Sequence, residues 1–359
     1  MSATASPRRG GARALSVEDA LAAIAAGATA RDQRPDGFPE QAVRLLEDCG
    51  AMGWGAALGH RQEWSLVRSV ARADGSVGRI LDGHLNGVER LLALAPGALR
   101  AAEMRALADG ERRIGVWGAD PAPGEGEPAR ITDGASGPVI TGVKVFCSGA
   151  GGVDRALVAA ASDGGAPKLA YVDVTRAVEI DRDWYAAAGL RTSESHRLVF
   201  HGAPVVALLG GPGELVREPW FSRDAIRTAA SRAGIADRAA AAALDALAAR
   251  ERRGELTGAA AGRIVGALAG IDRWLDSAAA VADDLGHDLA DTSVLLRAAI
   301  ADACRVVLDE GVRALGSRPL AAGGDLDRCR RDLELLLLQH RLDPMVARLG
   351  LRELERRSV

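Results

Sequence analysis

The chain has 359 residues, of which 48% are hydrophobic, and its 45 Lys and Arg residues nearly balance 48 Asp and Glu residues to give a formal net charge of −3. This length is sufficient to bury a sizeable core in two or three domains. The balanced charge argues against a nucleic-acid-binding surface or a polybasic membrane-binding patch, so a small molecule is the expected ligand.

Signals for targeting and for metal binding are absent from the sequence. No uncharged apolar run reaches the roughly 18 to 20 residues that cross a bilayer. Acidic residues interrupt the start of the chain where a signal peptide needs a continuous apolar segment, so we expect a cytoplasmic protein. The cysteines show no CxxC or Cys/His spacing, which predicts free buried thiols and no metal site. They are Cys49, Cys147, Cys304 and Cys329.

The first part of the chain is predicted to be helical. Residues 1–14 are rich in Ser, Pro, Gly and Arg and form an expected disordered tail. Residues 15–112 form the expected N-terminal α domain. In this segment Ser16 precedes a periodic apolar stretch and has Asp19 three residues on, which is a pattern typical of a helix start, while Gly50 is a helix stop.

Residues 113–217 change to short β-type runs separated by turn-forming clusters such as PAPGEGEP and SDGGAP. Several short strands at regular spacing predict a small antiparallel barrel or sandwich. This segment is the expected β domain.

Residues 218–359 are helical again and rich in alanine, which predicts a C-terminal four-helix bundle. The order of helices, strands and helices indicates an α+β fold with a β domain between two helical ones, and it excludes a doubly wound parallel sheet. The sequence has no GxGxxG after a strand and no GxxxxGK[ST], so nothing supports a Rossmann or P-loop site. The expected bundle helices cover residues 225–253, 260–285, 292–316 and 326–341.

Five stretches follow one another in order along the chain. They are ARADGSVGRILDGHLN (71–86), GVWGADP (115–121), GVKVFCSGA (142–150), GLRTSESHRLVFHGAPV (189–205) and the segment from RALGSRPL to QHRLDP (313–344). In order and spacing they resemble the acyl-CoA dehydrogenase superfamily, whose members hold FAD between a β domain and a C-terminal helical bundle. The resemblance spans about residues 38–350 and implies a flavin-dependent oxidoreductase.

The resemblance implies a flavin site along three of these stretches. Ala119 and Asp120 replace the Thr and Glu that the family uses beside the flavin pyrimidine, which leaves backbone contacts. Phe146 and Ser148 lie two residues apart on a predicted strand and therefore face the same side. An aromatic face and a hydroxyl donor suit a flavin ring. The implied flavin-binding residues are Trp117, Gly118, Ala119, Phe146, Cys147, Ser148, Thr192 and Ser193.

The family's Arg-x-x-Phe-Gly turn, which contacts FAD across a dimer interface, is here ARERRGELTG. By the resemblance, Arg250 or Arg252 is then the ligand of the pyrophosphate. The expected cofactor is FAD, with FMN as the alternative. The resemblance also implies a homodimer or a homotetramer.

The position of the family's catalytic glutamate is occupied by His340, whose side chain has a suitable pKa for a general base near neutral pH. Some members instead carry the carboxylate at the start of the first bundle helix, which is Asp224 here. A carboxylate at that position also serves as a helix cap.

The flavin-dependent monooxygenase branch of the superfamily lacks this glutamate and takes reduced flavin from a partner reductase. It shows an aromatic-x-Ser-Gly strand end, a pocket histidine in the N-terminal domain, and a histidine near an Asp-Pro in the last helix. The matching features are FCSGA, His84 and His340 with RLDP. Histidines in these places are candidates for hydrogen bonding and proton donation during oxygen transfer.

Three functions follow as hypotheses. The first is oxidation of an acyl or other apolar substrate, such as a CoA thioester, with His340 in place of the usual Glu and with an electron-transfer partner. The second is a two-component monooxygenase that uses reduced flavin and O2. The third is a redox-inactive binding or assembly protein that keeps the fold.

Overall fold

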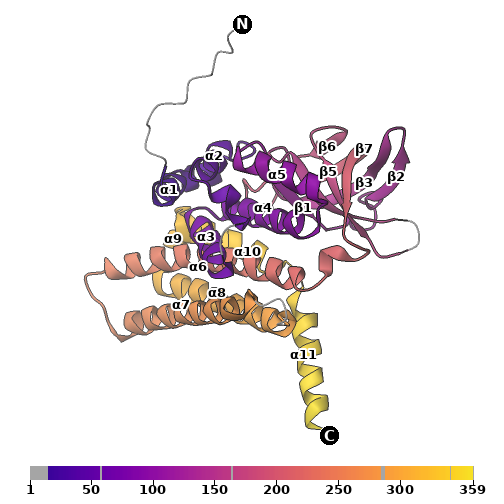
Figure 1. Ribbon diagram of the computed structural model, residues 1–359. Helices are drawn as coiled ribbons and strands as arrows, with labels where there is room; N and C mark the ends of the chain where they lie inside the picture. Colours follow the sequence, from indigo (N-terminus) through magenta and orange to yellow (C-terminus); the bar gives the residue numbers. More distant parts are fainter. Residues whose placement is uncertain (1–14, 57–58, 163–164, 284–287, 340, 359) are drawn as a thin grey trace.

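The computed structural model describes residues 15–56, 59–162, 165–283, 288–339 and 341–358. The predicted tail at 1–14 and the candidate base His340 lie outside these residues. The described chain passes through helices, then a sheet, then helices again, which is the α+β order that the sequence predicts (Figure 1).

The N-terminal helices begin and end where the sequence signals place them. The side chain of Ser16 accepts a hydrogen bond from the backbone N of Asp19 at 3.0 Å and caps the first helix. Gly50, with φ of 80°, follows the end of the second helix. These elements are α1 (Val17–Gln33), α2 (Glu40–Asp48), the 3-10 helix η1 (Ala51–Ala56), α3 (His60–Ala73), α4 (Gly75–Leu94) and α5 (Gly97–Ala108).

The middle of the chain forms a seven-stranded sheet with the order β1-β4-β5-β7-β3-β2, and β6 also pairs with β7. The predicted antiparallel pairing holds for every pair except β1 with β4, which run parallel. The strands are β1 (Ile114–Trp117), β2 (Arg130–Gly134), β3 (Gly137–Cys147), β4 (Arg155–Ala160), β5 (Lys168–Asp173), β6 (Val178–Asp181) and β7 (His196–Leu209).

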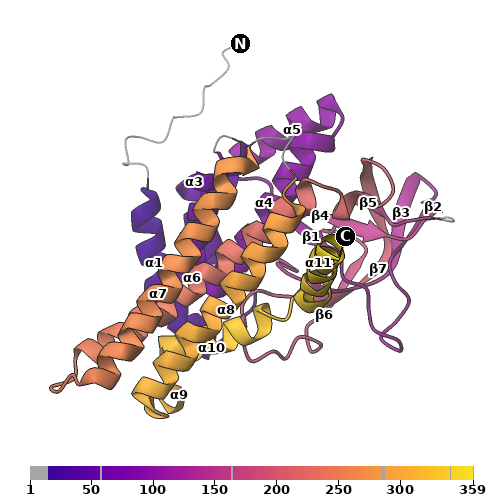
Figure 2. The ribbon, with the colours of Figure 1, turned by 90° about the horizontal axis from the view of Figure 1, so that it is seen from below.

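The C-terminal helices include three long ones that lie side by side (Figure 2). The helix predicted over 326–341 ends at Leu336, and a separate last helix begins at Leu342 and extends away from the body of the molecule (Figure 1). The elements are η2 (Glu214–Val216), α6 (Trp220–Ala248), α7 (Glu255–Ala282), α8 (Ala290–Leu315), α9 (Arg318–Ala321), α10 (Asp325–Leu336) and α11 (Leu342–Arg357).

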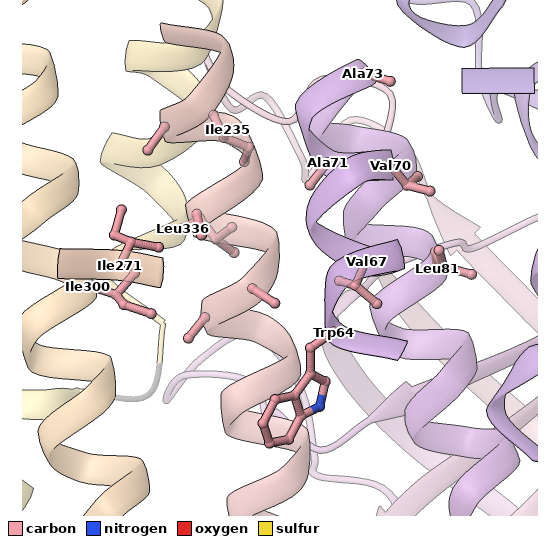
Figure 3. Packing of buried hydrophobic residues seen from close by; sticks show 14 of the residues in the cluster. Trp64, Val67, Val70, Ala71, Ala73, Leu81, Ile235, Ile271, Ile300 and Leu336 are labelled. Atoms are coloured by element: carbon pink, nitrogen blue, oxygen red, sulfur yellow. The ribbon is translucent and has the colours of Figure 1, made fainter. Parts of the chain in front are cut away.

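One hydrophobic core joins the N-terminal helices to the C-terminal ones. Figure 3 shows Ala71 of α3 on the side that faces the α6 helix carrying Ile235, with Ile271 of α7 and Ile300 of α8 on the other side of α6. Helix α6 is therefore covered on both sides, and many of its inward positions are alanine, which lets the helices approach closely. None of the helices in the described part of the chain combines the length and the hydropathy needed to cross a membrane.

The α3 and α6 backbones meet at Gly234. A Cβ atom at this position would lie 2.0 Å from the carbonyl oxygen of Arg68 and 2.8 Å from the backbone N of Arg72. Both obstacles are backbone atoms of a packed helix, so a rotamer change cannot remove them. Gly234 thus fixes how closely the N-terminal helices and the C-terminal helices pack.

We expect Gly234→Ala to lower the free energy of unfolding by at least about 2 kcal/mol, because the added methyl group forces α3 and α6 apart. Gly262→Ala in α7 is the matched control, since a Cβ there meets nothing within 4 Å and alanine favours helix by about 1 kcal/mol. Urea denaturation of both variants measures the difference. Equal stability of the two would contradict the close-packing argument.

Candidate functional site

The main cavity, of about 670 Å³, lies where the N-terminal helices, the sheet and the C-terminal helices meet. One wall is formed by α4 and α6, a second by the ends of β1 and β3, and a third by the end of α10 with the residues that follow it. Most of its surface is apolar, and a few polar groups reach it. This composition is typical of a small-molecule site.

The helical wall follows directly from helix geometry. Arg79, Gly83 and Asn86 recur at intervals of four and three residues along α4, so they share the face that lines the cavity. Asp224 and Thr228 are four residues apart on α6 and line the cavity from the other helix.

Phe146 lies at the end of β3 and lines the cavity with 52% of its surface exposed. Its ring meets the Trp184 ring edge to face, with the ring centroids 4.8 Å apart and the ring planes at 77°. An exposed aromatic face held in one orientation by a neighbouring ring is suited to a planar ligand. The structure therefore places this predicted residue in the site.

Gly118 and Ala119, also predicted from the sequence, line the same wall. They are fixed by the buried Lys144, whose Nζ donates to Asp120 Oδ1 at 2.6 Å and to the Gly118 carbonyl at 3.3 Å. The backbone N of Val145 also donates to the Ala119 carbonyl at 3.2 Å. The strand end is thus rigid, and it presents backbone rather than side chains to the cavity.

Hydroxyl groups form a short chain beside Phe146. Ser148 Oγ and Ser195 Oγ line the cavity 2.8 Å apart, and Ser195 Oγ lies 2.8 Å from Ser193 Oγ. Ser193 is fully buried and reaches the cavity through Ser195. Ser148 and Ser193 were predicted from the sequence, whereas Ser195, which connects them, was not.

Three other predicted flavin ligands lie behind the cavity wall. Trp117 is buried, and its indole N–H donates to the Ser148 carbonyl at 3.1 Å. Cys147 is fully buried, which raises the pKa of its thiol well above the ordinary value. The backbone N of Thr192 donates to Ser76 Oγ at 3.4 Å. These residues support the wall and do not line it.

Backbone strain is concentrated at this cavity. Among the described residues, five that are not glycine have a positive φ, and Phe146 (52°), Leu190 (49°) and Arg341 (36°) line the cavity. Glu194 (49°) adjoins the lining residue Ser195. Each such conformation costs about 1 kcal/mol or more and persists where the surroundings impose it, most often at functional sites.

The Leu190 conformation is imposed by a buried carboxyl group on α10. Asp332 Oδ1 accepts a hydrogen bond from the backbone N of Leu190 at 2.5 Å, and the Tyr185 hydroxyl donates to the Leu190 carbonyl at 3.4 Å. Burial raises the pKa of Asp332 to about 7, although the Leu190 hydrogen bond and Arg328 oppose that rise. Asp332 thus connects the last helices to the cavity wall.

Asp224, a predicted catalytic carboxylate, lines the cavity, but its charge is engaged. Its Oδ2 lies 2.6 Å from Arg90 Nη2, and its Oδ1 lies 3.4 Å from Arg227 Nη1. Burial raises the pKa of Asp224 to about 7, while Arg90 and Arg227 oppose the rise. Because both of its carboxylate oxygens lie near arginines, Asp224 fits a polar anchor in the cavity wall better than a general base.

His84 does not take the pocket position that the sequence comparison gave it. Its Nδ1 accepts from the backbone N of Ile114 at 3.1 Å, so its Nε2 carries the proton and donates to the Met52 carbonyl at 2.8 Å. Burial lowers the pKa of His84 to about 4, although the bond to Met52 opposes this. His84 is therefore neutral and joins α4 to η1 and β1, because both of its ring nitrogens form hydrogen bonds with backbone groups of those elements.

His340 lies outside the described residues, while its neighbours Gln339 and Arg341 both line the cavity. In the leucine run that precedes it, Leu336 and Leu338 both line the cavity, but Leu336 is buried whereas Leu338 has 76% of its surface exposed. The difference arises because α10 ends at Leu336.

Arg250 and Arg252 lie at the far end of α6 from the cavity. Asp224 and Ala248, the last residue of this helix, are separated by 24 residues, which corresponds to about 36 Å, and Arg250 and Arg252 follow that end. Arg250 donates to the Ala314 carbonyl, and Arg252 is exposed. Within one chain, neither residue belongs to the cavity. No cluster of three or more His, Cys, Asp or Glu suited to a metal occurs in the described ranges.

Several lining residues escaped the sequence analysis, chiefly Arg79, Asn86, Tyr185, Ser195 and Thr228. A signal for the first two was present, because polar residues on an otherwise apolar helix recur there at helical spacing. Tyr185 and Thr228 carry no local signal, since each enters the site through tertiary packing.

Comparison with known proteins gives no matching family model. A dibenzothiophene monooxygenase from Rhodococcus qingshengii is 28% identical over 228 residues, covering 57% of this chain and 50% of the relative. The chain thus spans about half the length of the curated relatives that it matches.

Two solved structures share the fold over nearly the whole chain. An FMN-bound dibenzothiophene monooxygenase from Paenibacillus sp. A11-2 aligns with a TM-score of 0.79 and 19% identity, over 93% of this chain and 95% of that one. Butyryl-CoA dehydrogenase from Megasphaera elsdenii aligns with a TM-score of 0.78 and 19% identity, over 90% and 94%.

We expect Asp332→Asn to flatten the pH dependence of stability between about pH 4 and pH 7. A carboxyl group whose pKa is about 7 when folded and about 4 when unfolded stabilises the fold fully below pH 4, and this contribution is lost as the pH rises through 7. Asparagine keeps an oxygen for the Leu190 N–H but does not titrate. Relative to wild type, the variant should gain roughly 1 to 3 kcal/mol between pH 5 and pH 8.

Urea denaturation of wild type and variant at pH 5 and at pH 8 measures this change in stability. Asp133→Asn, on the exposed face of β2, controls for the loss of one negative charge. Parallel pH profiles of wild type and Asp332→Asn would show that the Asp332 carboxyl does not hold its proton in the folded protein.

Proposed function

The chain has the fold of the acyl-CoA dehydrogenase superfamily, and we propose that it acts as the oxygenase component of a two-component flavin-dependent monooxygenase. It would take reduced flavin from a partner reductase and use O2 to oxygenate a largely apolar substrate. The reaction would place one oxygen atom in the substrate and release the other as water, with two electrons supplied by the reduced flavin and two protons.

The observation that carries this proposal is the state of the carboxylate in the cavity. Dehydrogenation of an acyl thioester needs a base that is free to remove a proton. Among the described lining residues, Asp224 is the one carboxylate, and Arg90 holds it at 2.6 Å. We therefore favour oxygenation over the dehydrogenation that was the first hypothesis from the sequence.

The residues present fit a flavin. Phe146 offers an apolar face, the backbone of Gly118 and Ala119 offers hydrogen-bonding groups, and Ser148 with Ser195 offers hydroxyl donors along the same wall. When bound, the flavin would supply the redox chemistry, while the protein supplies orientation and a shielded site. FMN and FAD both suit this wall, and FMN is our first choice because the ligand of one structural neighbour is FMN.

The remaining side chains would bind the substrate and handle protons. Apolar residues of η2, α6 and α10 would exclude water around the substrate, and the chain of serine hydroxyls would hydrogen-bond a polar atom at the reacting end. We further propose that His340 donates a proton during oxygen transfer. Support for this role is the position of Gln339 and Arg341, both at the cavity, together with the family comparison.

The α6–α7 turn supports a role for a second copy of the chain. Arg250 and Arg252 follow the far end of α6, which is about 36 Å along the helix from Asp224 in the cavity, so they would reach a flavin only in a neighbouring copy. A homo-oligomer in which they contact the phosphate end of the cofactor is part of this proposal.

We expect Phe146→Gly to weaken FMN binding at least about tenfold while leaving the melting temperature of the flavin-free protein unchanged or higher. Glycine removes the apolar face but relieves the positive φ at this residue, which costs about 1 kcal/mol. Fluorescence titration with FMN and thermal unfolding measure the two effects. Val206→Ala, at another exposed apolar residue of the sheet, is the matched control and should change neither.

Failure of the wild-type protein to bind FMN or FAD would contradict the proposal and favour the redox-inactive hypothesis. Unchanged affinity in Phe146→Gly would instead show that flavin binds outside this wall.

Turnover should require three additions together, namely a flavin reductase, NAD(P)H and O2, with an apolar heteroaromatic or organosulfur compound as the trial substrate. With ¹⁸O2, one labelled oxygen atom should appear in the product by mass spectrometry. His340→Gln should lower the oxygenation rate at least about tenfold without changing FMN affinity. Anaerobic bleaching of bound flavin by an acyl-CoA, with no oxygen incorporated, would support dehydrogenation instead.

A further inference from the structure

A second, smaller cavity of about 170 Å³ lies among the start of α6, the first turns of α8 and the last helix, α11. Phe221 lines both this cavity and the main one, so the two are neighbours. No part of the proposed oxygenation uses the smaller cavity, and its charged lining differs from the apolar walls of the main cavity.

Arg297 of α8 is the unusual feature of this cavity. Its side chain is almost fully buried, with 2% of the residue exposed. The one hydrogen bond that it donates runs to the sulfur of Met345 at 3.3 Å, and its Nε has no partner in the described structure. A thioether sulfur is a weak acceptor, so the guanidinium charge lacks compensation.

Arg297 differs from the other buried arginines in its hydrogen-bond partners. The described chain has six, and five of them bond carboxylate or carbonyl oxygens. For example, Arg90 pairs with Asp224, and Arg232 donates to the carbonyls of Leu336 and Gln339. Arg297 alone among the six has neither kind of oxygen partner. Burying an unpaired cation costs several kcal/mol, so a missing anion is the physical explanation.

A second unpartnered group lies one helical turn earlier on the same face of α8. Ser293 is 1% exposed, and its hydroxyl has no hydrogen-bond partner in the described structure. Ser293 and Arg297 both line the cavity and are four residues apart, so their polar atoms reach the same space. A hydroxyl donor beside a guanidinium is a common combination for binding an oxyanion.

The carboxylates that line the cavity do not neutralise Arg297. Glu218 accepts from Ser222 Oγ at 2.9 Å and from the backbone N of Ser222 at 3.2 Å. Asp291 pairs with Arg352 of α11. Burial lowers the pKa of Arg297, and the charge of Glu218 opposes this only in part. Arg348, a further cation in the lining, forms no ion pair with the described residues.

We propose that this cavity binds a small oxyanion, such as a phosphate or sulfate group, between Arg297 and Ser293 of α8 and Arg348 of α11. The volume suits a group of this size and excludes a whole nucleotide. The anion would join α8 to α11 and would complete the hydrogen bonding of the buried guanidinium.

The position of α11 gives this site a consequence for the main cavity. Leu338, Gln339 and Arg341 directly precede α11 and line the main cavity. An anion that holds α11 against α8 would therefore also hold this wall of the main cavity in place.

The oxyanion has two sources of the same chemistry, a free ion and the phosphate of a bound flavin, because Phe221 lines both cavities. In the second case the flavin phosphate would bind here instead of at Arg250 and Arg252 of a neighbouring copy. Competition separates them. Inorganic phosphate that displaces FMN, but not riboflavin, assigns the site to the flavin phosphate. Phosphate and FMN that bind independently assign it to a free ion.

The test uses Arg297→Met on the full-length protein, with thermal unfolding in sodium chloride and in sodium phosphate at equal ionic strength. In chloride the variant should be as stable as wild type or more stable, because it removes an unpaired buried charge. In phosphate the order should reverse, since wild type gains a bound anion and the variant does not. Phosphate affinity should fall at least about tenfold in Arg297→Met and also fall in Ser293→Ala.

Arg356→Gln is the control, because it removes a cation from the same helix at an exposed position and should keep the phosphate response. It also accounts for the general stabilising effect of phosphate on folded proteins. An equal phosphate response in wild type and Arg297→Met would overturn the proposal, as would the absence of any specific phosphate or sulfate binding to wild type. Neither result depends on flavin binding or on turnover.

Discussion

The arrangement of the main cavity depends on one buried guanidinium group, that of Arg227. This side chain of α6 is fully buried and donates to Glu63 of α3 at 2.7 Å, while its Nη2 lies 3.1 Å from Glu89 of α4. It therefore ties together three helices, of which α4 and α6 form a wall of the cavity. Breaking a buried pair of this kind costs about 3 to 5 kcal/mol, so the pair holds the three helices in fixed positions relative to one another. Arg90 adds a second such tie, from α4 to Asp224.

The wall of the cavity on the side of the sheet is held by a buried lysine and by its backbone conformation. Lys144 donates a hydrogen bond to the Gly118 carbonyl just after β1. Phe146, Leu190 and Glu194 have a positive φ, which residues with a side chain rarely adopt. Strain of this kind survives because the surrounding contacts outweigh it, and it orients groups before a ligand arrives. The cavity is thus preorganised on both sides. Rigid walls with polar groups at chosen points suit a site in which the cofactor performs the redox step and the protein positions it.

Much of the fold could be predicted from the sequence, because strand runs, caps and alanine-rich helical periodicity are local properties. Phe146, Ser148, Gly118 and Ala119, which were predicted to bind flavin, all line the cavity, because they lie at or just after the ends of two strands that meet there. His84 shows what the sequence could not predict. Its place in the sequence suggested a histidine in the pocket, but its two nitrogens bond backbone groups of η1 and β1. These segments come from other parts of the chain, so only the tertiary structure decides which groups the ring meets. The pairing of Asp224 with Arg90, 134 residues apart, is likewise invisible locally.

The last helix has a mechanical consequence. Helix α11 has 16 residues and is therefore about 24 Å long, and it starts beside Arg341, whose backbone has φ of 36° (Figure 1). A rotation of about 10° at that residue would carry the far end of the helix roughly 4 Å, by the same helix dimensions, while the cavity rim next to the pivot would shift by only a fraction of this distance. A contact made far out on this helix, where Leu351 and Leu354 are exposed, would therefore displace the helix end much more than the rim of the cavity.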